Sequence, residues 1–244
     1  MITLEQALAE PPPPPRIHYP ESDGQPMGDN DQQRDWMNKI IENLKALSAG
    51  RSDVYVTGNL FWYPVEGNNR IVQAPDAMVV LGRPPGQRGC YKQWEEEGIA
   101  PQVVFEIVSP SNSLDELVRK RAFYQKYGVE EYYVYDPEDC ILEGYLRSAS
   151  GFQPVAQMNG WRSPRVGVQF HLGADGLELR YPDGRPFLEV WELFQKLEQE
   201  RTRAEQEWAR AEQERTRAEA QTARAERLAA KLRALGVDPD KEME

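Results

Sequence analysis

Two carboxylates stand in segments that are otherwise apolar. Asp76 lies in residues 74–81 (APDAMVVL), and Glu106 lies in residues 103–108 (VVFEIV). Apolar runs of this length are typical of strands buried on both faces. A charged carboxylate there is costly unless a metal ion or a positive partner compensates it. Two such acids, one on each of two neighbouring strands, predict an acidic site.

The chemistry that this pair predicts is metal-assisted attack on phosphate. Side-chain alternation lets Asp76 and Glu106 point to the same edge of a sheet if their two strands pair. Two acidic oxygens, completed by water or phosphate oxygens, are what a magnesium ion prefers. Such an ion can activate water and stabilise charge on a phosphate transition state. The sequence therefore predicts a Mg²⁺ (or Mn²⁺) site.

A positive group near that phosphate would complete the site, and Lys120 is the candidate. It follows the Glu106 strand on a predicted helix, at the border of the buried stripe. Each of the three residues also has a structural interpretation. Asp76, after Pro75, could belong to a turn, and Glu106 could form a buried pair with Arg or Lys. Lys120 could be an ordinary surface lysine whose stem packs on the helix.

The elements that would position these residues can be read from periodicity and end signals. The pattern predicts helices at 32–48 and 113–127 and a mixed sheet, hence an α/β sandwich. The second helix has Ser113 as N-cap and Glu116 at the third helical position, with Gly128 after its end. Its buried side is predicted to hold Leu114, Leu117, Val118 and Tyr124. Strands are expected at 53–63, 70–81, 103–108, 132–135, 140–146, 152–156 and 177–181.

Composition divides the chain into three regimes. Residues 1–30 contain five consecutive prolines and predict an extended tail. Residues 31–186 are aromatic and apolar, and they predict the folded domain. Residues 187–244 are rich in Ala, Glu, Gln and Arg and predict a long charged helix.

A seven-residue repeat in the charged helix raises the question of a coiled coil. Ala204, Ala211, Ala218, Ala225 and Leu232 share one heptad position. The paired core position would hold a tryptophan, an arginine and a threonine, which make a poor seam. Arg/Glu pairs three or four residues apart support the helix without any partner. Two interpretations remain open: residues 187–235 form a homodimer or higher oligomer, or they are a solvated helical tail.

The bulk composition excludes several classes of protein. Only two histidines are present, which argues against Ser-His-Asp and Cys-His hydrolases. Two cysteines are too few for a disulfide framework, and reduced thiols indicate a cytoplasmic protein. No apolar run is long enough for a membrane helix, so no membrane partner is expected.

The formal net charge of −11 argues against nucleic-acid binding over the whole surface. A local basic cluster is nevertheless expected beside the acids, and it could attract a phosphate backbone. An ordinary solvated helix face explains the same cluster equally well. Its members are Arg119, Lys120, Arg121 and Lys126.

Several motifs together resemble one known family. Pro75-Asp76 is followed by 106–111 (EIVSPS), by Lys120 and Tyr124, and by 127–133 (YGVEEYY). In this order they are similar to the Uma-two family, which belongs to the PD-(D/E)XK nuclease superfamily. The resemblance is close over about residues 31–150. It implies a restriction endonuclease-like fold and hydrolysis of phosphodiester bonds. The resemblance does not identify the substrate, and DNA is the substrate that we expect.

The resemblance also implies residue roles. Asp76 and Glu106 would ligate the metal with help from the Ile107 carbonyl, and Lys120 would position water and neutralise phosphate charge. The superfamily's lysine two residues after the glutamate is Val108 here, which is why the following helix supplies the candidate. Tyr63 and Tyr124 could line the cleft, although both also suit an aromatic core.

A different class of function remains open. The displaced lysine, the acidic charge and the long helix would also suit a catalytically inactive nuclease-fold module that acts as a scaffold. A further possibility is that residues 187–235 carry the main function by assembling the protein.

Overall fold

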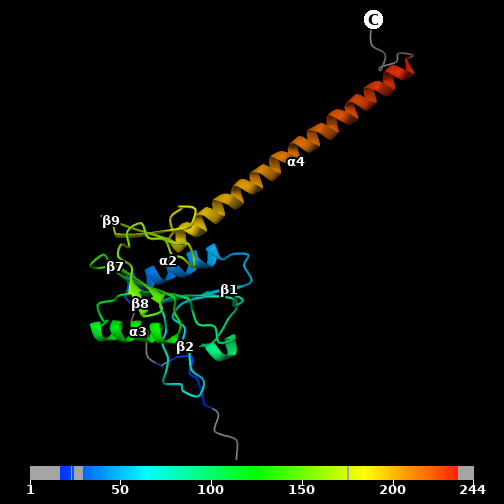
Figure 1. Cartoon of the computed structure of the whole chain (residues 1–244). Coiled ribbons are helices and arrows are strands. Elements are labelled where there is room, and N and C mark those ends of the chain that lie inside the picture. Colours follow the sequence, from blue (N-terminus) through cyan, green and yellow to red (C-terminus); the bar gives the residue numbers. More distant parts are fainter. Residues whose placement is uncertain (1–16, 23, 25–29, 175, 236–244) are drawn as a thin grey trace, which may run out of the picture. The chain divides into compact units, whose positions relative to one another are not determined.

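A computed structural model describes residues 17–22, 24, 30–174 and 176–235 (Figure 1). The chain forms two compact units, Met1–Val190 and Trp191–Glu244, which are described separately. Most of the predicted tail at 1–30, including its proline run, lies outside the described residues. The domain limits expected at 30 and 186 stay predictions.

A six-stranded mixed sheet forms the centre of the first unit. Its strand order is β1-β3-β5-β6-β7-β8, in which β5 and β6 are parallel and the other neighbours are antiparallel. The strands are β1 (Val54–Thr57), β3 (Ala77–Leu81), β5 (Val103–Ile107), β6 (Glu131–Asp136), β7 (Ile141–Ser148) and β8 (Gly151–Pro154).

Two small sheets accompany the large one. In the first, β2 (Trp62–Tyr63) pairs in parallel with β4 (Tyr91–Lys92), which leads into the short 3-10 helix η1 (Gln93–Glu96). In the second, β9 (Gln169–Gly173) and β10 (Gly176–Arg180) are antiparallel.

Two helices cover opposite faces of the central sheet (Figure 1). Helix α2 (Asp31–Leu47) packs through Met37, Ile40 and Leu44 in one apolar cluster. Helix α3 (Leu114–Tyr127) contributes Tyr124 to the cluster on the other face. This arrangement confirms the predicted α/β fold class, a mixed sheet flanked by helices.

The end signals of α3 are confirmed. The Ser113 hydroxyl accepts a hydrogen bond from the Glu116 amide, and Gly128 closes the helix in the left-handed conformation at φ 113°. The predicted buried side is partly wrong. Tyr124 is buried, but Leu114 is 82% exposed and Val118 is 54% exposed. The first turns of the helix stand off the sheet and leave a cleft.

The strand predictions are corrected in the stretch around Asp76. The expected strand at 53–63 is divided into β1 and β2, because Asn59 has φ 50° and turns the chain. The expected strand at 70–81 begins only at Ala77, since Pro75 has no N–H to donate to a ladder. Asp76 therefore precedes its strand rather than lying inside it. Strands β4 and β9 were not predicted.

The second unit is built on α4 (Val190–Ala234), a helix of 45 residues. Ion pairs one turn apart join Arg201 to Glu205 at 3.1 Å and Arg203 to Glu207 at 2.9 Å. They support the helix locally, as the charge pattern predicts. Within the described part of the chain, no helix is long and apolar enough to cross a membrane.

Candidate functional site

Asp76 reaches the second acidic strand through its side chain. Residues Ala77 and Phe105 are direct partners in the β3–β5 ladder, so Asp76 lies at the same level as Glu106. Its Oδ2 accepts the backbone N–H of Ile107 at 2.7 Å. Asp76 lies one residue before the start of β3, and its side chain supplies the hydrogen-bond acceptor that a β3 carbonyl would otherwise provide to β5. It is held in one orientation beside Glu106.

Glu106 is almost fully enclosed in the site, with 2% of its surface exposed. Its Oε2 accepts a hydrogen bond from Lys120 Nζ at 2.8 Å. Its Oε1 accepts one from the Tyr124 hydroxyl at 2.5 Å. Both donors come from α3, one turn apart, because residues four apart lie on the same face of a helix. Helix α3 therefore positions a cation and a hydroxyl over the β5 carboxylate.

Charge inside the site is not balanced by Lys120 alone. Burial first, and then the Glu106 carboxylate, raise the pKa of Asp76 to about 8. Lys120, the Ile107 amide and Gln33 oppose this rise without cancelling it. The site holds two acids and one lysine, so it favours a further proton or a further cation.

Lys120 remains a cation in this setting. Burial by itself lowers the pKa of Lys120, but Glu106 and Asp76 more than offset this and raise it above its usual value. Glu116, on the next turn of α3, approaches the ammonium at 3.9 Å. Burial and the charge of Glu106 also raise the pKa of the Tyr124 hydroxyl, which keeps its proton and acts as a donor.

The donor set fits a hard divalent cation. Carboxylate oxygens from Asp76 and Glu106 lie near the backbone of Ile107, and oxygen is the ligand that Mg²⁺ prefers. No cluster of three or more His, Cys, Asp or Glu suited to metal occurs among the described residues. Water or substrate oxygens would have to complete the coordination, as is usual for Mg²⁺.

Gln33 is a site residue that the sequence interpretation missed. It lies in the first turn of α2, where the Asn30 side chain caps its amide at 2.7 Å. Its Nε2 donates to the Ile107 carbonyl at 3.3 Å, and the side chain also reaches Asp76. A glutamine in a first helical turn carries no signal of this role. Its burial follows from where α2 crosses the sheet.

The structure brings Asp76, Glu106, Lys120 and Ile107 together, whereas other expected residues lie elsewhere. The buried Tyr63 donates to the Pro20 carbonyl at 2.7 Å. The predicted basic cluster also disperses. Arg119 and Lys126 are exposed, and Arg121 donates to the Tyr145 hydroxyl at 2.6 Å. Of these four cations, Lys120 is the one that joins Glu106.

Comparisons with known proteins give one family match and a similar solved structure. The model of the family described as "Uma2: Putative restriction endonuclease" matches residues 5–173. A crystal structure from Anabaena variabilis ATCC 29413, titled a "putative nuclease belonging to DUF820", is similar at a TM-score of 0.41. The two chains are 14% identical, and the match covers 57% of this chain and 74% of that one. No curated protein matches the chain.

Proposed function

The chain belongs to the Uma2 family, and from this premise and the site we propose that it is a divalent-metal-dependent endonuclease. The proposed reaction is hydrolysis of phosphodiester bonds, with DNA as substrate. The observation that carries the proposal is the meeting of Asp76, Glu106 and Lys120 in one buried site that is short of positive charge.

In this proposal Asp76, Glu106 and the Ile107 carbonyl hold Mg²⁺ or Mn²⁺. The ion would lower the pKa of a bound water and offset charge on the phosphate. Lys120 neutralises phosphate charge and orients the attacking water. Tyr124 fixes one oxygen of Glu106, and the Ile107 amide fixes one oxygen of Asp76. These bonds would keep the carboxylates in place before the ion arrives.

Cleavage of supercoiled, linear and branched DNA in Mg²⁺ or Mn²⁺ tests the activity. Glu106→Gln and Lys120→Ala should each lower the rate by about a hundredfold or more, because each removes charge at the reacting phosphate. Lys126→Ala, an exposed lysine of the same helix, is the matched control and should retain the rate. Equal rates in all four proteins would indicate a contaminating nuclease and contradict the mechanism.

One observation favours a second candidate, a non-catalytic scaffold on the same fold. Both oxygens of Glu106 already have donors, and a buried Lys–Glu pair can be purely structural. Calorimetric titration with Mg²⁺ or Mn²⁺ separates the two candidates. Metal binding that Asp76→Asn abolishes supports the enzyme, and absence of binding at millimolar metal supports the scaffold.

The long helix belongs to the proposal as an assembly element. We propose that residues 187–235 mediate a homodimer or higher oligomer, and that the protein acts in the cytoplasm. The apolar side chains of Trp191, Phe194 and Leu197 are each at least 60% exposed at the start of α4, which supports an interaction there.

A further inference from the structure

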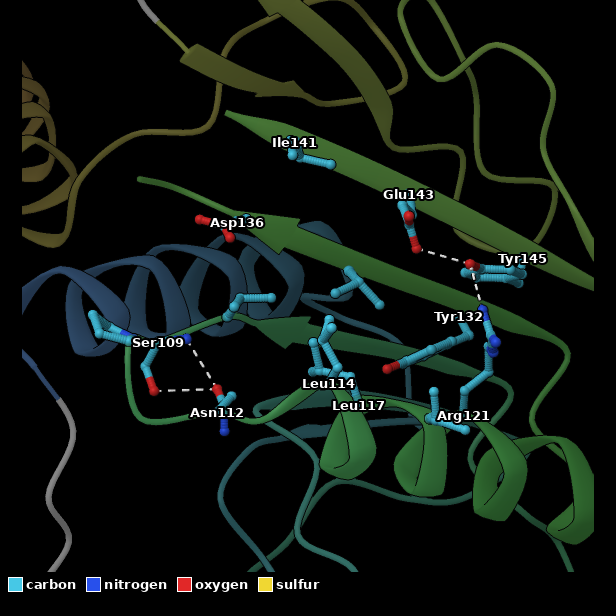
Figure 2. A pocket seen from close by; sticks show the side chains of 14 residues that line it. Ser109, Asn112, Leu114, Leu117, Arg121, Tyr132, Asp136, Ile141, Glu143 and Tyr145 are labelled. Carbon is cyan, nitrogen blue, oxygen red and sulfur yellow. Dashed lines mark hydrogen bonds between the residues drawn. The ribbon is translucent and has the colours of Figure 1, made fainter. Parts of the chain in front are cut away.

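A cleft opens beside the candidate site, between α3 and strands β6 and β7 (Figure 2). Its volume is about 460 Å³, within the range of sites for small organic ligands. Val108 and Ser109, which directly follow the end of β5 at Ile107, form one end of it. Residues that line the cleft therefore follow the proposed catalytic strand directly in the sequence.

The sheet wall of the cleft is in register with Glu106. In the ladders, Glu106 is opposite Val134 on β6, and Val134 is opposite Glu143 on β7. Opposite residues share a face, and adjacent strands are about 4.8 Å apart. The cleft thus begins one strand away from the proposed catalytic acid, on the same face of the sheet.

The helix wall is apolar and open. Leu114, Leu117 and Val118 of α3 line it, and Ile141 of β7 lines the facing rim. Three of these four side chains are more than half exposed, namely Leu114, Val118 and Ile141. Clustered apolar side chains at the mouth of a cleft are typical of a binding surface.

A buried tyrosine hydroxyl lies in the cleft. Tyr132 is 1% exposed, and among the described residues nothing forms a hydrogen bond with its hydroxyl. Figure 2 shows the hydroxyl directed toward the leucines of α3. Buried polar groups are nearly always paired, so an exception at a cleft points to a ligand that supplies the missing partner.

Planar and charged side chains at one end of the cleft are joined by successive hydrogen bonds. Arg121 donates to the Tyr145 hydroxyl, which donates to Glu143 at 2.8 Å. The guanidinium carbon of Arg121 also lies 4.9 Å from the centre of the Tyr145 ring. Glu143 and Asp136 of the lining are acids and would repel an anion. The cleft therefore suits a flat uncharged group better than a phosphate.

We propose that this cleft receives a nucleobase of the substrate, next to the phosphate that the candidate site would hold. Apolar walls suit the faces of a base, and the Tyr132 hydroxyl suits a polar group on its edge. The inference rests on the proposed function, since it adds a base-binding position one strand from Glu106. A base held there would fix which phosphate lies at the two carboxylates.

Titration with the four free deoxynucleosides tests the cleft without any cleavage. Binding is followed by NMR on the full-length protein, through the methyl signals of Leu117 and Val118. At least one nucleoside should shift these signals. Leu117→Trp and, at the rim, Val118→Trp should weaken binding by about tenfold or more, because an indole fills the space. Leu228→Trp, on the exposed surface of α4, is the matched control and should bind normally.

Tyr132→Phe gives a second readout. Binding should weaken by about two- to tenfold through loss of one hydrogen bond. The free energy of unfolding should be unchanged or higher, since the variant removes an unpaired buried hydroxyl. A purely structural tyrosine would lose stability instead. Such a loss, with unaltered nucleoside binding, would overturn the role of Tyr132.

The outcomes separate this inference from the proposed function. Glu106→Gln should lower the rate of DNA cleavage by about a hundredfold or more and retain nucleoside binding. Cleavage by a protein that binds no nucleoside would support the nuclease and overturn the base cleft. Nucleoside binding without cleavage of any DNA would support the cleft and contradict the nuclease. Binding that survives both tryptophan variants would place the nucleoside elsewhere and overturn the inference.

Discussion

Glu106 is the carboxylate that contacts the buried cation of the candidate site. Lys120 and Tyr124 donate to its two oxygens, and the second acid, Asp76, lies at the same level of the sheet. Removal of the lysine would leave two buried carboxylates without their cation. The behaviour of the pair without Lys120 therefore reveals whether a metal can take its place.

In buffer that contains a metal chelator, Lys120→Met is expected to lower the free energy of unfolding by about 3 kcal/mol, because it breaks a buried ion pair. Added Mg²⁺ should restore part of this loss if the carboxylates bind the ion. Urea denaturation with and without Mg²⁺ measures both effects. Lys126→Met is the control on the exposed side of α3 and should change little. An unchanged free energy of unfolding for Lys120→Met would contradict a stabilising ion pair between Lys120 and the buried carboxylates.

Glu131 provides a pH-dependent contribution to stability away from the site. It is buried at the start of β6, accepts hydrogen bonds from the Ser163 and Tyr133 hydroxyls and from the Arg165 amide, and burial raises its pKa. A raised native pKa stabilises the fold below the unfolded pKa, about 4.3 for glutamate. This contribution is lost as the pH rises through the native pKa.

Glu131→Gln removes this titration. The wild-type free energy of unfolding should therefore fall relative to that of the variant as the pH rises above about 4.3. Urea denaturation of both proteins at several pH values, in chelated buffer, measures the difference. A difference independent of pH would show that the pKa of Glu131 is the same in the folded and unfolded states, and it would contradict this prediction.

At the scale of elements, sequence signals from neighbouring residues predicted the bounds of helices better than they predicted how the helices pack on the sheet. The helix at 32–48 and the caps of α3 follow from nearby residues such as Ser113 and Gly128, and they agree with the structure. The exposure of Leu114 depends on where α3 lies over the sheet, which no periodicity encodes. The proximity of Asp76 and Glu106 was predictable from strand alternation and pairing, and that of Lys120 from its place on the helix that follows the Glu106 strand. Gln33 joins them only because α2 crosses the opposite face.

Gly58 shows how a neighbouring element positions Asp76. A Cβ at this glycine would lie 2.1 Å from the Asp76 carbonyl oxygen and 2.4 Å from Ile41 Cδ1. Gly58→Ala should therefore cost about 1–3 kcal/mol of stability and displace the Asp76 backbone. Denaturation and Mg²⁺ titration measure the two consequences.

Gly173→Ala is the matched control for this prediction. A Cβ at Gly173 would meet nothing within 4 Å, so this variant should retain both stability and metal affinity. Equal behaviour of the two alanine variants would show that the close approach at Gly58 does not hold Asp76.

At the scale of the whole molecule, the two units have separate sources of stability. The apolar clusters of the first unit end at Phe187, and α4 is supported by its own ion pairs. The two units should therefore fold independently.

Removal of residues 191–244 is expected to leave a folded protein with an unaltered unfolding midpoint. The helical signal in circular dichroism should fall by the contribution of α4. Sedimentation velocity should show a monomer for this variant and a larger species for the full chain if the helix mediates assembly. A monomer in both cases would contradict the assembly role, and a collapse of the truncated protein would contradict separate folding.

The bond between the Ile107 amide and Asp76 has a further consequence. Most amides of the central sheet are protected by bonds between strands, but this one is protected by a side chain. Its proton can exchange with deuterium whenever the carboxylate swings away, even while the strands stay paired. The exchange rate at this single amide therefore measures how often the Asp76 carboxylate leaves it, separately from the unfolding of the sheet.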